Sequence, residues 1–431
     1  MQQSNTHMKI LILGSGGRED ALAWRISKDV SKENLFIAPG NGGSDKYGNV
    51  LNFSAGDFDA VAAAVSEYSI DLLIVGPEDP LVDGIRDFLQ EDDRCKNLKI
   101  LGPGANGAIL EGSKDFAKKF MQKYNIPTAK YRSFDASQVA EAKEFLKEFE
   151  PPYVIKADGL AAGKGVVILE KLEDAENHID QVFAENIFGA AGNKIVIEEF
   201  LDGIEVSMFA LCDGKNYVML PEAKDYKRVG EGDTGKNTGG MGTVSPVPFV
   251  GTVFMDKVIE RIVEPTVKGL QSDNIDFKGF IFFGLINVAG NPMVIEYNVR
   301  MGDPETQVVL PRIEGNFAQM LMDAASGNLE GQIVKFNNKT HLAVILASRG
   351  YPESYEKGKE IQLPLQCEST IFHAGTKIEG GQLMTNGGRV LAVVGSGATI
   401  DEARQKAYKA VYEVHFNGKT FRSDIGLDLK K

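Results

Sequence analysis

Residues 154–166, VIKADGLAAGKGV, combine two lysines with small residues in a pattern that suits phosphate binding. A short apolar run ends at Lys156, glycine and alanine follow, and a second apolar run begins after Gly165. Residues without bulky side chains let backbone N–H groups approach an anion closely, and the lysines add positive charge. We therefore predict a phosphate-binding loop between two strands. The alternative interpretation is a hairpin rich in glycine and alanine with solvated lysines.

This stretch is not a P-loop. A P-loop has the pattern G-x-x-x-x-G-K-[ST] and runs from a strand into a helix. Gly159 and Gly163 are one residue too close for that pattern, and Gly165 stands in place of the serine or threonine. The apolar residues that follow, 166–169, predict a strand and not a helix. The pattern therefore indicates a different nucleotide-binding architecture.

A second group of candidate residues lies in VIEYNVRMGDPETQ, residues 294–307. On a strand, Glu296, Asn298 and Arg300 point to one side, because side chains alternate between the two faces. Carboxylate and amide oxygens suit a hard cation such as Mg²⁺, and Arg300 could hold a carboxylate or a phosphate. The alternative is a solvated polar strand face, but the dense polar run at 303–307 favours a metal site.

A third candidate segment is KDYKRVGEGDTGKNTGGMGT, residues 224–243. It is long, polar and rich in glycine, and loops of this length in compact domains are usually functional or disordered. Asp225, Lys227 and Arg228 lie in it together with the run NTGGMG at 237–242. We therefore predict a functional loop here.

The elements that position these residues begin with a regular alternation of strands and helices. Strands are predicted at 9–13, 35–38, 72–75 and 99–101, and helices at 58–67 and 82–89. This alternation is typical of a parallel α/β sheet that binds its ligand at the carboxyl ends of the strands. The glycine turn after the first strand suits an anion, but the dinucleotide pattern G-x-G-x-x-G fails because Glu19 replaces its third glycine.

The remaining chain mixes helices and strands. Helices are predicted at 109–124, 136–149 and 252–270, a hairpin at 153–169, and strands at 194–199, 205–212, 279–287, 293–298 and 342–347. Thr399 and Glu402 form the capping-box pattern at the start of a last helix. His373 is interpreted as a packed loop histidine and not as a catalytic residue.

Composition limits the function classes. The chain has 431 residues, enough for several domains, with 43% hydrophobic and 25% charged residues. A net charge of −13 argues against binding to nucleic acid or to an anionic membrane. The three cysteines are far apart, which argues against a zinc site or a disulfide framework and favours a reducing compartment. No run of apolar residues is long enough for a membrane span, and no signal peptide is recognisable, so we expect a cytoplasmic protein.

Together, these blocks resemble the ATP-grasp superfamily and, within it, the phosphoribosylamine–glycine ligase family. The resemblance is collinear over nearly the whole chain from Met8. It rests on GGRE at 16–19, APGN at 38–41, IVGPE at 74–78, LEGSK at 110–114, VIKADGLAAGKGV at 154–166, VIEEFLDG at 196–203, NTGGMG at 237–242, RMGDPETQ at 300–307, FHAGT at 372–376 and TNGGRV at 385–390.

The resemblance implies roles for individual residues. At the nucleotide, it implies Lys114 and Lys156 for the ATP phosphates, the loop with Gly159, Gly163, Lys164 and Gly165 over them, Glu198, Glu199, Phe200 and Leu201 at the adenine, and Glu205 at the ribose. It implies Glu296 and Asn298 as ligands of Mg²⁺ or Mn²⁺. For the substrates and reacting groups, it implies Gly17, Pro39, Gly76, Glu78, Asp225, Lys227, Asn237, Gly239, Gly240, Arg300, Gly302 and Asp303.

The resemblance also implies a fold and an activity. We expect an α/β protein with a Rossmann-like N-terminal parallel sheet (1–109), an ATP-grasp core (110–131 and 194–330), a lid subdomain (132–193) and a small C-terminal α+β domain (331–431). The expected reaction joins glycine to 5-phosphoribosylamine through glycyl phosphate, with ATP as the third substrate. We expect a monomer or a weak homo-oligomer.

Two positions depart from the family pattern, which commonly has histidine where this chain has Asp20 and Tyr226. A role that needs imidazole there is therefore in question. Three alternatives stay open at this point: an ATP-grasp ligase for another acid or amine, a nicotinamide-dependent oxidoreductase that uses the first sheet, and a nucleotide-binding regulatory module without chemistry. The failed dinucleotide pattern counts against the oxidoreductase, and Glu296, Asn298 and Arg300 count against the regulatory module.

Overall fold

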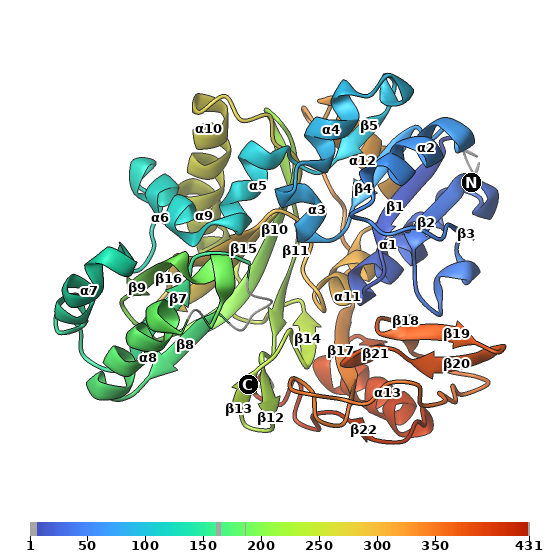
Figure 1. Ribbon diagram of the computed structural model, residues 1–431. Helices are drawn as coiled ribbons and strands as arrows, with labels where there is room; N and C mark the ends of the chain where they lie inside the picture. Colours follow the sequence, from blue (N-terminus) through green and yellow to red (C-terminus); the bar gives the residue numbers. More distant parts are fainter. Residues whose placement is uncertain (1–6, 161–164, 186, 430–431) are drawn as a thin grey trace.

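The computed structural model describes residues 7–160, 165–185 and 187–429. Within these ranges, no helix is both long and apolar enough to cross a membrane. Figure 1 shows a parallel sheet on one side, a smaller sheet on the other side, and a long central sheet that continues into the C-terminal part.

The first sheet is parallel, as its alternating pattern predicts. Its strand order is β3-β2-β1-β4-β5, and its strands are β1 (Ile10–Gly14), β2 (Leu35–Pro39), β3 (Asn49–Val50), β4 (Leu72–Val75) and β5 (Lys99–Leu101). Its helices are α1 (Gly17–Ile26), α2 (Phe58–Tyr68), α3 (Glu78–Val82) and α4 (Ile85–Glu91). β1 and β4 are completely buried, which explains their continuous apolar runs. The helix predicted at 82–89 is present as α4 but begins later, at Ile85, because Gly84 has φ +84° and separates α4 from α3.

The central sheet has nine strands and joins the middle of the chain to its C-terminal part. Its order is β16-β15-β10-β11-β14-β17-β21-β18, and β22 pairs with β17. The strands are β10 (Ile204–Asp213), β11 (Tyr217–Asp225), β14 (Gly242–Ser245), β15 (Lys278–Val288), β16 (Asn291–Asn298), β17 (Thr340–Ser348), β18 (Thr370–His373), β21 (Arg389–Gly397) and β22 (Lys419–Thr420). A separate hairpin of β19 (Thr376–Glu379) and β20 (Gln382–Thr385) lies beside it. Because β14 pairs with β17, the sheet is continuous from residue 204 to the C-terminal strands.

The smaller sheet contains the predicted phosphate hairpin. Its order is β6-β9-β7-β8, with β6 (Tyr131–Asp135), β7 (Tyr153–Ala157), β8 (Val166–Leu169) and β9 (Lys194–Glu198). All its pairings are antiparallel. Helices α7 (Val139–Leu146) and α8 (Leu172–Ala184) pack on it through a separate apolar core that includes Phe134, Ile155 and Ile179. This unit is called the lid sheet below.

The remaining helices follow the first sheet in the chain or lie between strands of the central sheet. They are α5 (Ala105–Gly112), α6 (Lys114–Lys123), α9 (Thr252–Val258), α10 (Glu264–Ser272), α11 (Thr306–Val309), α12 (Phe317–Ser326) and α13 (Ile400–Glu413). The single helix predicted at 109–124 is two helices, because Ser113 caps α6 through a hydrogen bond from the Phe116 N–H, 3.1 Å long. The helix predicted at 252–270 contains a π-helical turn at Ile259–Val263. The cap of α13 is close to expectation: Thr399 accepts from the Glu402 N–H, while the Glu402 carboxylate accepts from Ala398.

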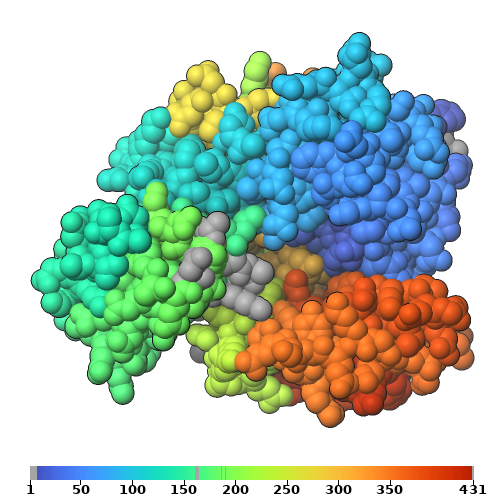
Figure 2. Space-filling model, viewed as in Figure 1, coloured from blue at the N-terminus to red at the C-terminus, as the bar shows by residue number. Residues whose placement is uncertain are grey.

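Segment 224–243 is more regular than the predicted loop. β11 extends to Asp225, the hairpin of β12 (Arg228–Gly230) and β13 (Thr234–Asn237) follows, and β14 begins at Gly242. The prediction of one long loop is therefore wrong for much of its length. The segment lies beside a hollow between the lid sheet, in green, and the C-terminal part, in orange (Figure 2).

Candidate active site

Lys114 and Lys156 approach one region from different elements. Lys114 begins α6, and its Nζ donates to the carbonyl oxygen of Gly159 at 3.0 Å. Lys156 lies on β7, and its Nζ is 3.4 Å from the carbonyl oxygen of Ile295 on β16. Burial lowers the pKa of Lys114, and the charge of Glu296 opposes that shift. Both lysines therefore lie beside the strand that carries Glu296.

Glu198, at the end of β9, is a buried carboxylate with two lysine partners. It forms ion pairs with Lys156 and with Lys118 of α6. Burial alone would raise the pKa of this carboxyl, but Lys156 and Lys118 hold it below its ordinary value. Sequence reasoning missed Lys118. Its spacing of four residues from Lys114, which places both side chains on one helix face, was the available signal.

Residues 199–201, expected at the adenine, follow β9 directly. The backbone N–H of Glu199 donates to the carbonyl oxygen of Lys130 at 2.9 Å, and Phe200 is an exposed aromatic side chain. Leu201 is half-buried. These residues provide backbone groups and apolar surface near the two lysines. Gly163 and Lys164, expected over the phosphates, lie outside the described residues.

Gly159 and Gly165 are described residues at the two ends of the loop predicted to bind phosphate. The carbonyl oxygen of Gly165 accepts from the N–H of Ala157 at 2.7 Å, which closes the β7–β8 hairpin. A Cβ on Gly159 would come within 2.7 Å of the side chain of Ala191, so only glycine fits without a shift. The Asp158 carboxylate accepts from the Ser113 hydroxyl and from the N–H of Asp115. The hairpin is thereby connected to the start of α6.

Glu296 and Asn298 lie two residues apart on β16 and share one face. A Cβ on Gly284, the partner of Glu296 on β15, would come 2.9 Å from the Glu296 Cγ, so this glycine leaves room for the carboxylate. Within the described ranges, no group of three or more His, Cys, Asp or Glu residues could hold a metal ion. Glu296 and Asn298 supply two hard oxygen ligands, which fits a cation that takes its other ligands from nucleotide phosphates.

Lys227 lies among carboxylates from different strands. Its Nζ is 2.6 Å from Oε2 of Glu205 on β10. Burial opposes its protonation, but Glu205, Asp225 and Glu296 together hold the pKa of Lys227 well above its ordinary value. The Lys227 and Glu205 side chains keep 38% and 42% exposure, which leaves this pair open to a ligand.

Asp225, at the end of β11, belongs to the same group. Burial raises the pKa of its carboxyl to about 7. Lys227 opposes the shift, whereas the carboxylates of Glu305, Glu205 and Glu296 increase it. A carboxyl with a pKa near neutrality is suited to proton transfer at physiological pH. Sequence reasoning missed Glu305, although it lies in the same polar run as Asp303.

Arg300 connects this region to the first sheet. It lies beyond β16, so the expectation that it shares a strand face with Glu296 and Asn298 does not hold. Its Nε donates to Glu78 on α3 at 3.1 Å, and its Nη2 donates to Glu111 on α5 at 2.5 Å. Burial raises the pKa of Glu111 to about 7, although Arg300 opposes the shift. Glu111 was not predicted as a site residue.

The loops at the carboxyl ends of β1 and β4 face the segment after β16. The N–H of Arg18 donates to Oδ2 of Asp303 at 3.3 Å, and a Cβ on Gly17 would come 3.3 Å from Oδ1 of the same carboxylate. A Cβ on Gly302 would lie 2.4 Å from the Glu305 carboxylate. Gly17, Gly302 and Asp303 are therefore close neighbours.

Gly76 and Pro39 complete this edge of the first sheet. A Cβ on Gly76 would lie 2.2 Å from Oε1 of Glu19, so the Glu19 side chain needs glycine there. Pro39 ends β2, and the next N–H, of Gly40, donates to the carbonyl oxygen of Gly14 at 3.2 Å. The three loops after β1, β2 and β4 thus meet at one edge, as predicted for a parallel sheet.

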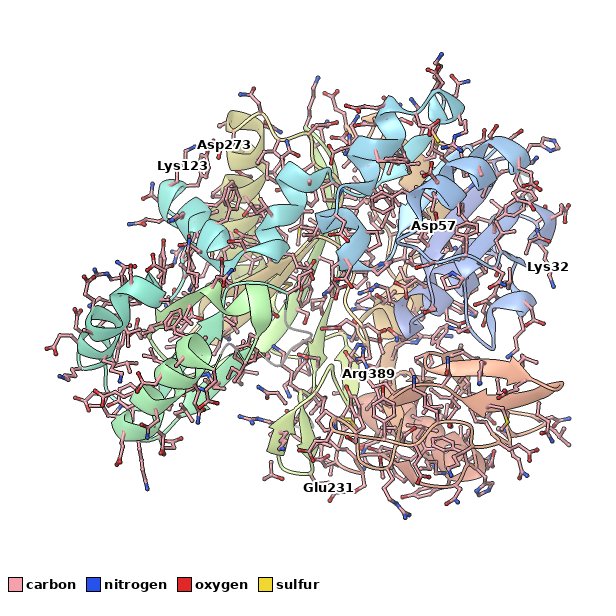
Figure 3. All side chains as sticks on the ribbon, in the orientation of Figure 1. Lys32, Asp57, Lys123, Glu231, Asp273 and Arg389 are labelled. Atoms are coloured by element: carbon pink, nitrogen blue, oxygen red, sulfur yellow. The ribbon has the colours of Figure 1, made fainter. Side chains whose placement is uncertain are left out.

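Arg389 joins the two glycine-containing segments around Gly239 and Asp303, and sequence reasoning missed it. Its Nη1 donates to the carbonyl oxygen of Gly239 at 2.5 Å and to that of Asp303 at 2.6 Å. Gly240 has φ +113°, and a Cβ there would come 2.5 Å from Pro304. Figure 3 shows Arg389 where the C-terminal strands meet the rest of the molecule. Its place in TNGGRV was the available signal. Asn237 ends β13, just before this loop.

The two departures from the family pattern have different surroundings. Tyr226 is buried, and its Oη donates to Oδ1 of Asp428 at 2.5 Å. Asp20 is also buried and accepts from the N–H of His373 at 2.9 Å. The His373 ring packs against Gly43 and contacts Thr376, and burial lowers its pKa to about 3. His373 is therefore a packed residue in the structure.

The lid sheet carries Lys156, and a strand of the central sheet carries the acid–amide pair Glu296 and Asn298. This arrangement of two sheets around one site defines an ATP-grasp enzyme. Family models of known proteins match this chain and agree with that class. The phosphoribosylglycinamide synthetase N domain matches residues 8–111, the ATP-grasp (A) domain of the same family matches 112–306, and the C domain matches 341–428.

Relatives extend this match over the full chain. A phosphoribosylamine–glycine ligase from Vibrio cholerae is 43% identical over 425 residues, which covers 97% of this chain and 98% of the relative. The crystal structure of a phosphoribosylamine–glycine ligase from Thermotoga maritima has a TM-score of 0.85 and 38% identity, and covers 97% of this chain and 100% of its own. The biotin carboxylase domain of a Hydrogenobacter thermophilus 2-oxoglutarate carboxylase shares the fold, with a TM-score of 0.72 and 15% identity over 96% and 91% of the two chains.

The chain belongs to the phosphoribosylamine–glycine ligase family. It is an ATP-dependent ligase of purine biosynthesis that acts on small molecules and, as an ATP-grasp enzyme, uses ATP with a divalent metal ion.

Proposed function

We propose that this chain joins glycine to 5-phosphoribosylamine through a glycyl phosphate intermediate, with ATP cleaved to ADP and phosphate. The observation that carries the proposal is the contact of Arg300 with Glu78 and Glu111, which connects the nucleotide side of the site to the loops of the first sheet. The proposed nucleotide side and the first-sheet loops are therefore neighbours, as a reaction between a nucleotide, a small acid and a phosphorylated sugar amine requires.

The chemistry requires activation of a carboxylate, because a carboxylate oxygen is a poor leaving group. In the proposed first step, a glycine carboxylate oxygen attacks the γ-phosphorus of ATP, and ADP leaves. In the second step, the amine nitrogen of phosphoribosylamine attacks the carbonyl carbon, the C–O bond to phosphate breaks, and the amine loses one proton. Such reactions depend mainly on positioning and charge neutralisation. No protein nucleophile is needed.

We assign the nucleotide to the lid side of the site. Lys114 and Lys156 hold its phosphates, with Gly159, Gly163, Lys164 and Gly165 over them. Residues 198–201 receive the adenine, and Glu205 binds the ribose. The support is the convergence of Lys114 on Gly159 and of Lys156 on Glu198.

We assign the reacting groups to the cluster around Lys227. Lys227 and Arg300 neutralise charge that develops on the acyl phosphate, and Asp225 accepts the proton that the attacking amine releases. The pKa of Asp225, about 7, supports this role, because the carboxyl is ionised in part at neutral pH and can take up a proton.

We assign phosphoribosylamine to the first-sheet edge. Gly17, Pro39, Gly76 and Glu78 contact it from that edge, while Asn237, Gly239, Gly240, Gly302 and Asp303 contact the substrates from the opposite side. Arg389 supports this arrangement, because it binds the carbonyl oxygens of both Gly239 and Asp303.

We propose Mg²⁺ or Mn²⁺ as the metal ion, held by Glu296 and Asn298. When bound, the ion would neutralise negative charge on the nucleotide phosphates. The fit of the donor set supports this assignment, because one carboxylate and one amide oxygen are hard ligands and Gly284 leaves room beside Glu296.

We further propose the division into units at 1–109, 110–131 with 194–330, 132–193 and 331–431, and a cytoplasmic protein that is a monomer or a weak homo-oligomer. The separate apolar core of the lid sheet supports its division from the ATP-grasp core.

An ADP-release assay tests the proposed function. The purified full chain is supplied with Mg·ATP, glycine and freshly made phosphoribosylamine, and each substrate is omitted in turn. ADP formation is expected only when both glycine and phosphoribosylamine are present. Equal turnover with an unrelated amine would contradict this substrate assignment and favour a different carboxylate–amine ligase. Absence of turnover with all substrates at saturation would favour the regulatory module.

A further inference from the structure

The segment that carries Asp225 and Lys227 contacts residues about two hundred positions further along the chain, on the side opposite to the site. The backbone between Asp225 and Lys227 is tied to the glycine-rich loop: Tyr226 N–H donates to the Gly242 carbonyl oxygen at 3.0 Å, and Met241 N–H donates to that of Tyr226 at 2.8 Å. Because side chains alternate along an extended chain, the Tyr226 side chain points away from the face that carries Asp225 and Lys227.

The side chains of Tyr226 and Lys224 both contact the carboxylate of Asp428. The Tyr226 Oη donates to Oδ1 at 2.5 Å, and the Lys224 Nζ lies 2.7 Å from Oδ2. The Tyr226 Oη also accepts from the N–H of Gly426 at 3.0 Å, and the Lys224 ammonium lies 3.9 Å from the centre of the tyrosine ring. One carboxylate thus fixes the residues on both sides of Asp225.

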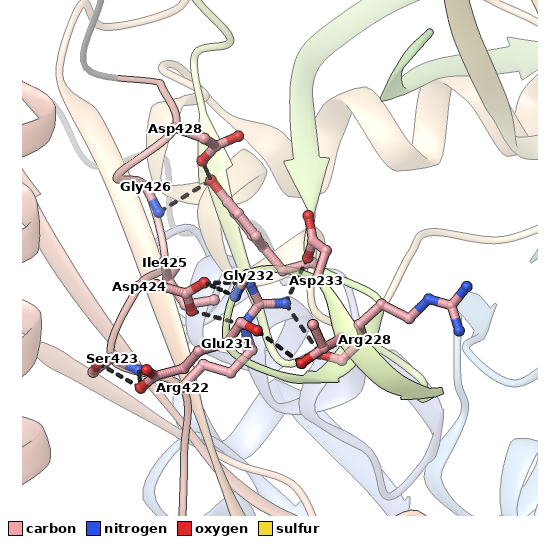
Figure 4. Close-up of polar contacts among 12 residues, drawn as sticks. Arg228, Glu231, Gly232, Asp233, Arg422, Ser423, Asp424, Ile425, Gly426 and Asp428 are labelled. Carbon is pink, nitrogen blue, oxygen red and sulfur yellow. Dashed lines mark hydrogen bonds and ion pairs between the residues drawn. The ribbon is translucent and has the colours of Figure 1, made fainter. Parts of the chain in front are cut away.

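A second set of contacts fixes the β12–β13 hairpin to the same segment, 422–428 (Figure 4). The buried guanidinium of Arg422 donates to both oxygens of Asp424, and its Nη1 donates to Asp233 at 2.7 Å and to the carbonyl oxygen of Arg228 at 3.1 Å. Asp424 also accepts from the N–H of Gly232 at 2.8 Å. Charge-assisted hydrogen bonds of this kind are stronger and more directional than neutral ones.

These anchors oppose a repulsion inside the site. Asp225 lies near the carboxylates of Glu205, Glu296 and Glu305, which raise its pKa in addition to the effect of burial. Like charges at short range favour movement of the chain away from the group. Lys227 compensates part of this repulsion through its ion pair with Glu205 on β10, and the contacts of Tyr226 and Lys224 with Asp428 hold the same segment from the opposite side.

We propose that segment 422–428 positions Asp225 and Lys227 for the ligase reaction, with Asp428 as the main positioning residue and Tyr226 as its contact. The inference rests on the proposed roles of Asp225 and Lys227. It also gives Tyr226 a role that does not need imidazole, because its hydroxyl acts on the outer side of the segment.

The test compares Asp428→Asn with the parent chain. The substitution keeps the shape of the side chain but removes the charge that holds Lys224, so a small displacement of Asp225 and Lys227 is expected. Misplacement of reacting groups by about 1 Å costs up to about a hundredfold in rate, and we expect kcat to fall about tenfold or more. The KM for ATP should change much less than kcat, because among the proposed nucleotide-binding residues the expected displacement reaches Glu205, through Lys227, and not Lys114 or Lys156. Hydrogen exchange should become faster within 225–241 and stay unchanged in the lid sheet.

Two further variants complete the experiment. Asp428→Glu restores the charge and should recover part of kcat. The control is Glu379→Gln, which removes the carboxylate of an ion pair with Lys377. Glu379 lies in the C-terminal part of the chain but away from the β12–β13 hairpin, so this variant should match the parent in kcat and in hydrogen exchange. If Asp428→Asn does not fold, Tyr226→Phe decides, because it keeps the buried ring and removes only the hydroxyl. It should show the same lower kcat and the same local exchange.

Two results would overturn the inference. The first is a kcat and a hydrogen-exchange rate equal to those of the parent in Asp428→Asn or Tyr226→Phe. The second is faster hydrogen exchange over the whole C-terminal part, which would indicate a merely structural role. If the parent chain forms no ADP from glycine and phosphoribosylamine, the proposed function fails. The exchange comparison then still decides whether segment 422–428 positions 225–241.

Discussion

The Nη2 of Arg300 and Oε1 of the buried Glu111 lie 2.5 Å apart, although these residues are separated by 189 positions in the chain. Glu111 also accepts from the N–H of Val299 at 2.8 Å, so one carboxylate fixes both the backbone and the side chain at the end of β16. Arg300 is thereby turned toward Glu78 and the first sheet, away from the strand face of Glu296. The contact explains how the segment after β16 lies beside both the strand face of Glu296 and the loops of the first sheet.

Replacement of Glu296 by glutamine should abolish most activity without loss of the fold. The change keeps the shape and removes the charge proposed to bind the metal ion, and loss of one preorganised electrostatic group costs about 10²–10³ in kcat. Higher Mg²⁺ should restore part of the rate. Glu264→Gln, which removes the carboxylate of an exposed ion pair on α10, is the control. Steady-state kinetics measures kcat, and circular dichroism checks the fold. A kcat within about threefold of the parent value is far less than the expected loss and would exclude Glu296 as the metal ligand.

Two lysines of α6 should differ sharply in their effect on stability. Lys118 is buried and pairs with Glu198, so Lys118→Met leaves that carboxylate with one partner and should lower the free energy of unfolding by about 3–5 kcal/mol. Lys123 pairs with Asp273 on the surface, where both residues are labelled in Figure 3, and Lys123→Met should cost less than about 1 kcal/mol. Urea unfolding of both variants measures the difference. Equal losses would contradict the buried ion pairs of Glu198.

Asp20 should make the protein less stable as the pH rises. Burial raises the pKa of its carboxyl from 3.8 to about 7, so between these values the folded protein holds a proton that the unfolded chain has released. The contribution of Asp20 to the free energy of unfolding therefore decreases from about pH 4 to about pH 7 and is constant above that range. Asp20→Asn removes this decrease, and its stability relative to the parent should grow by about 2–3 kcal/mol between pH 5 and pH 8. A difference that is independent of pH would contradict the buried, protonated Asp20.

Asp225 should control the acid side of the pH–rate profile. Its pKa is about 7 and the proposed mechanism needs the ionised form, so kcat/KM should rise through about pH 7 and then become constant. Asp225→Asn should lower the rate by about 10²–10⁴ and remove this rise.

Glu111→Gln is the discriminating control for that profile. The pKa of Glu111 is also about 7, but its carboxylate contacts Arg300 and Val299 and has no proposed part in proton transfer. This variant should keep the rise in kcat/KM through pH 7. If the rise disappears with Glu111→Gln and persists with Asp225→Asn, the proton acceptor is misassigned.

The sequence predicts the elements whose signals are local. The hairpin around Lys156 and the four predicted strands of the five-stranded first sheet are confirmed, because each combines an apolar run with glycine or proline at its end. The break at Ser113 was missed, although Ser113 is a favourable helix cap and its hydroxyl caps α6.

Contacts between distant segments could not be predicted from local patterns. The hairpin at 228–237 reads as a loop because its glycines and polar residues resemble a linker, and the contacts that order it come from Arg422 and Asp424. Lys118, Glu111, Glu305 and Arg389 each lie in or beside a segment with a sequence signal, but the partner that places each of them in the site is far away in the chain.

Glycine labelled with ¹⁸O in both carboxylate oxygens tests the glycyl phosphate intermediate most directly. The proposed reaction transfers one carboxylate oxygen to the γ-phosphorus of ATP, and cleavage of the C–O bond then releases that oxygen with the phosphate. Mass spectrometry of the products should find one ¹⁸O in each released phosphate and one in the carbonyl group of the glycinamide ribonucleotide. Unlabelled phosphate formed together with the amide product would contradict activation of glycine by phosphoryl transfer.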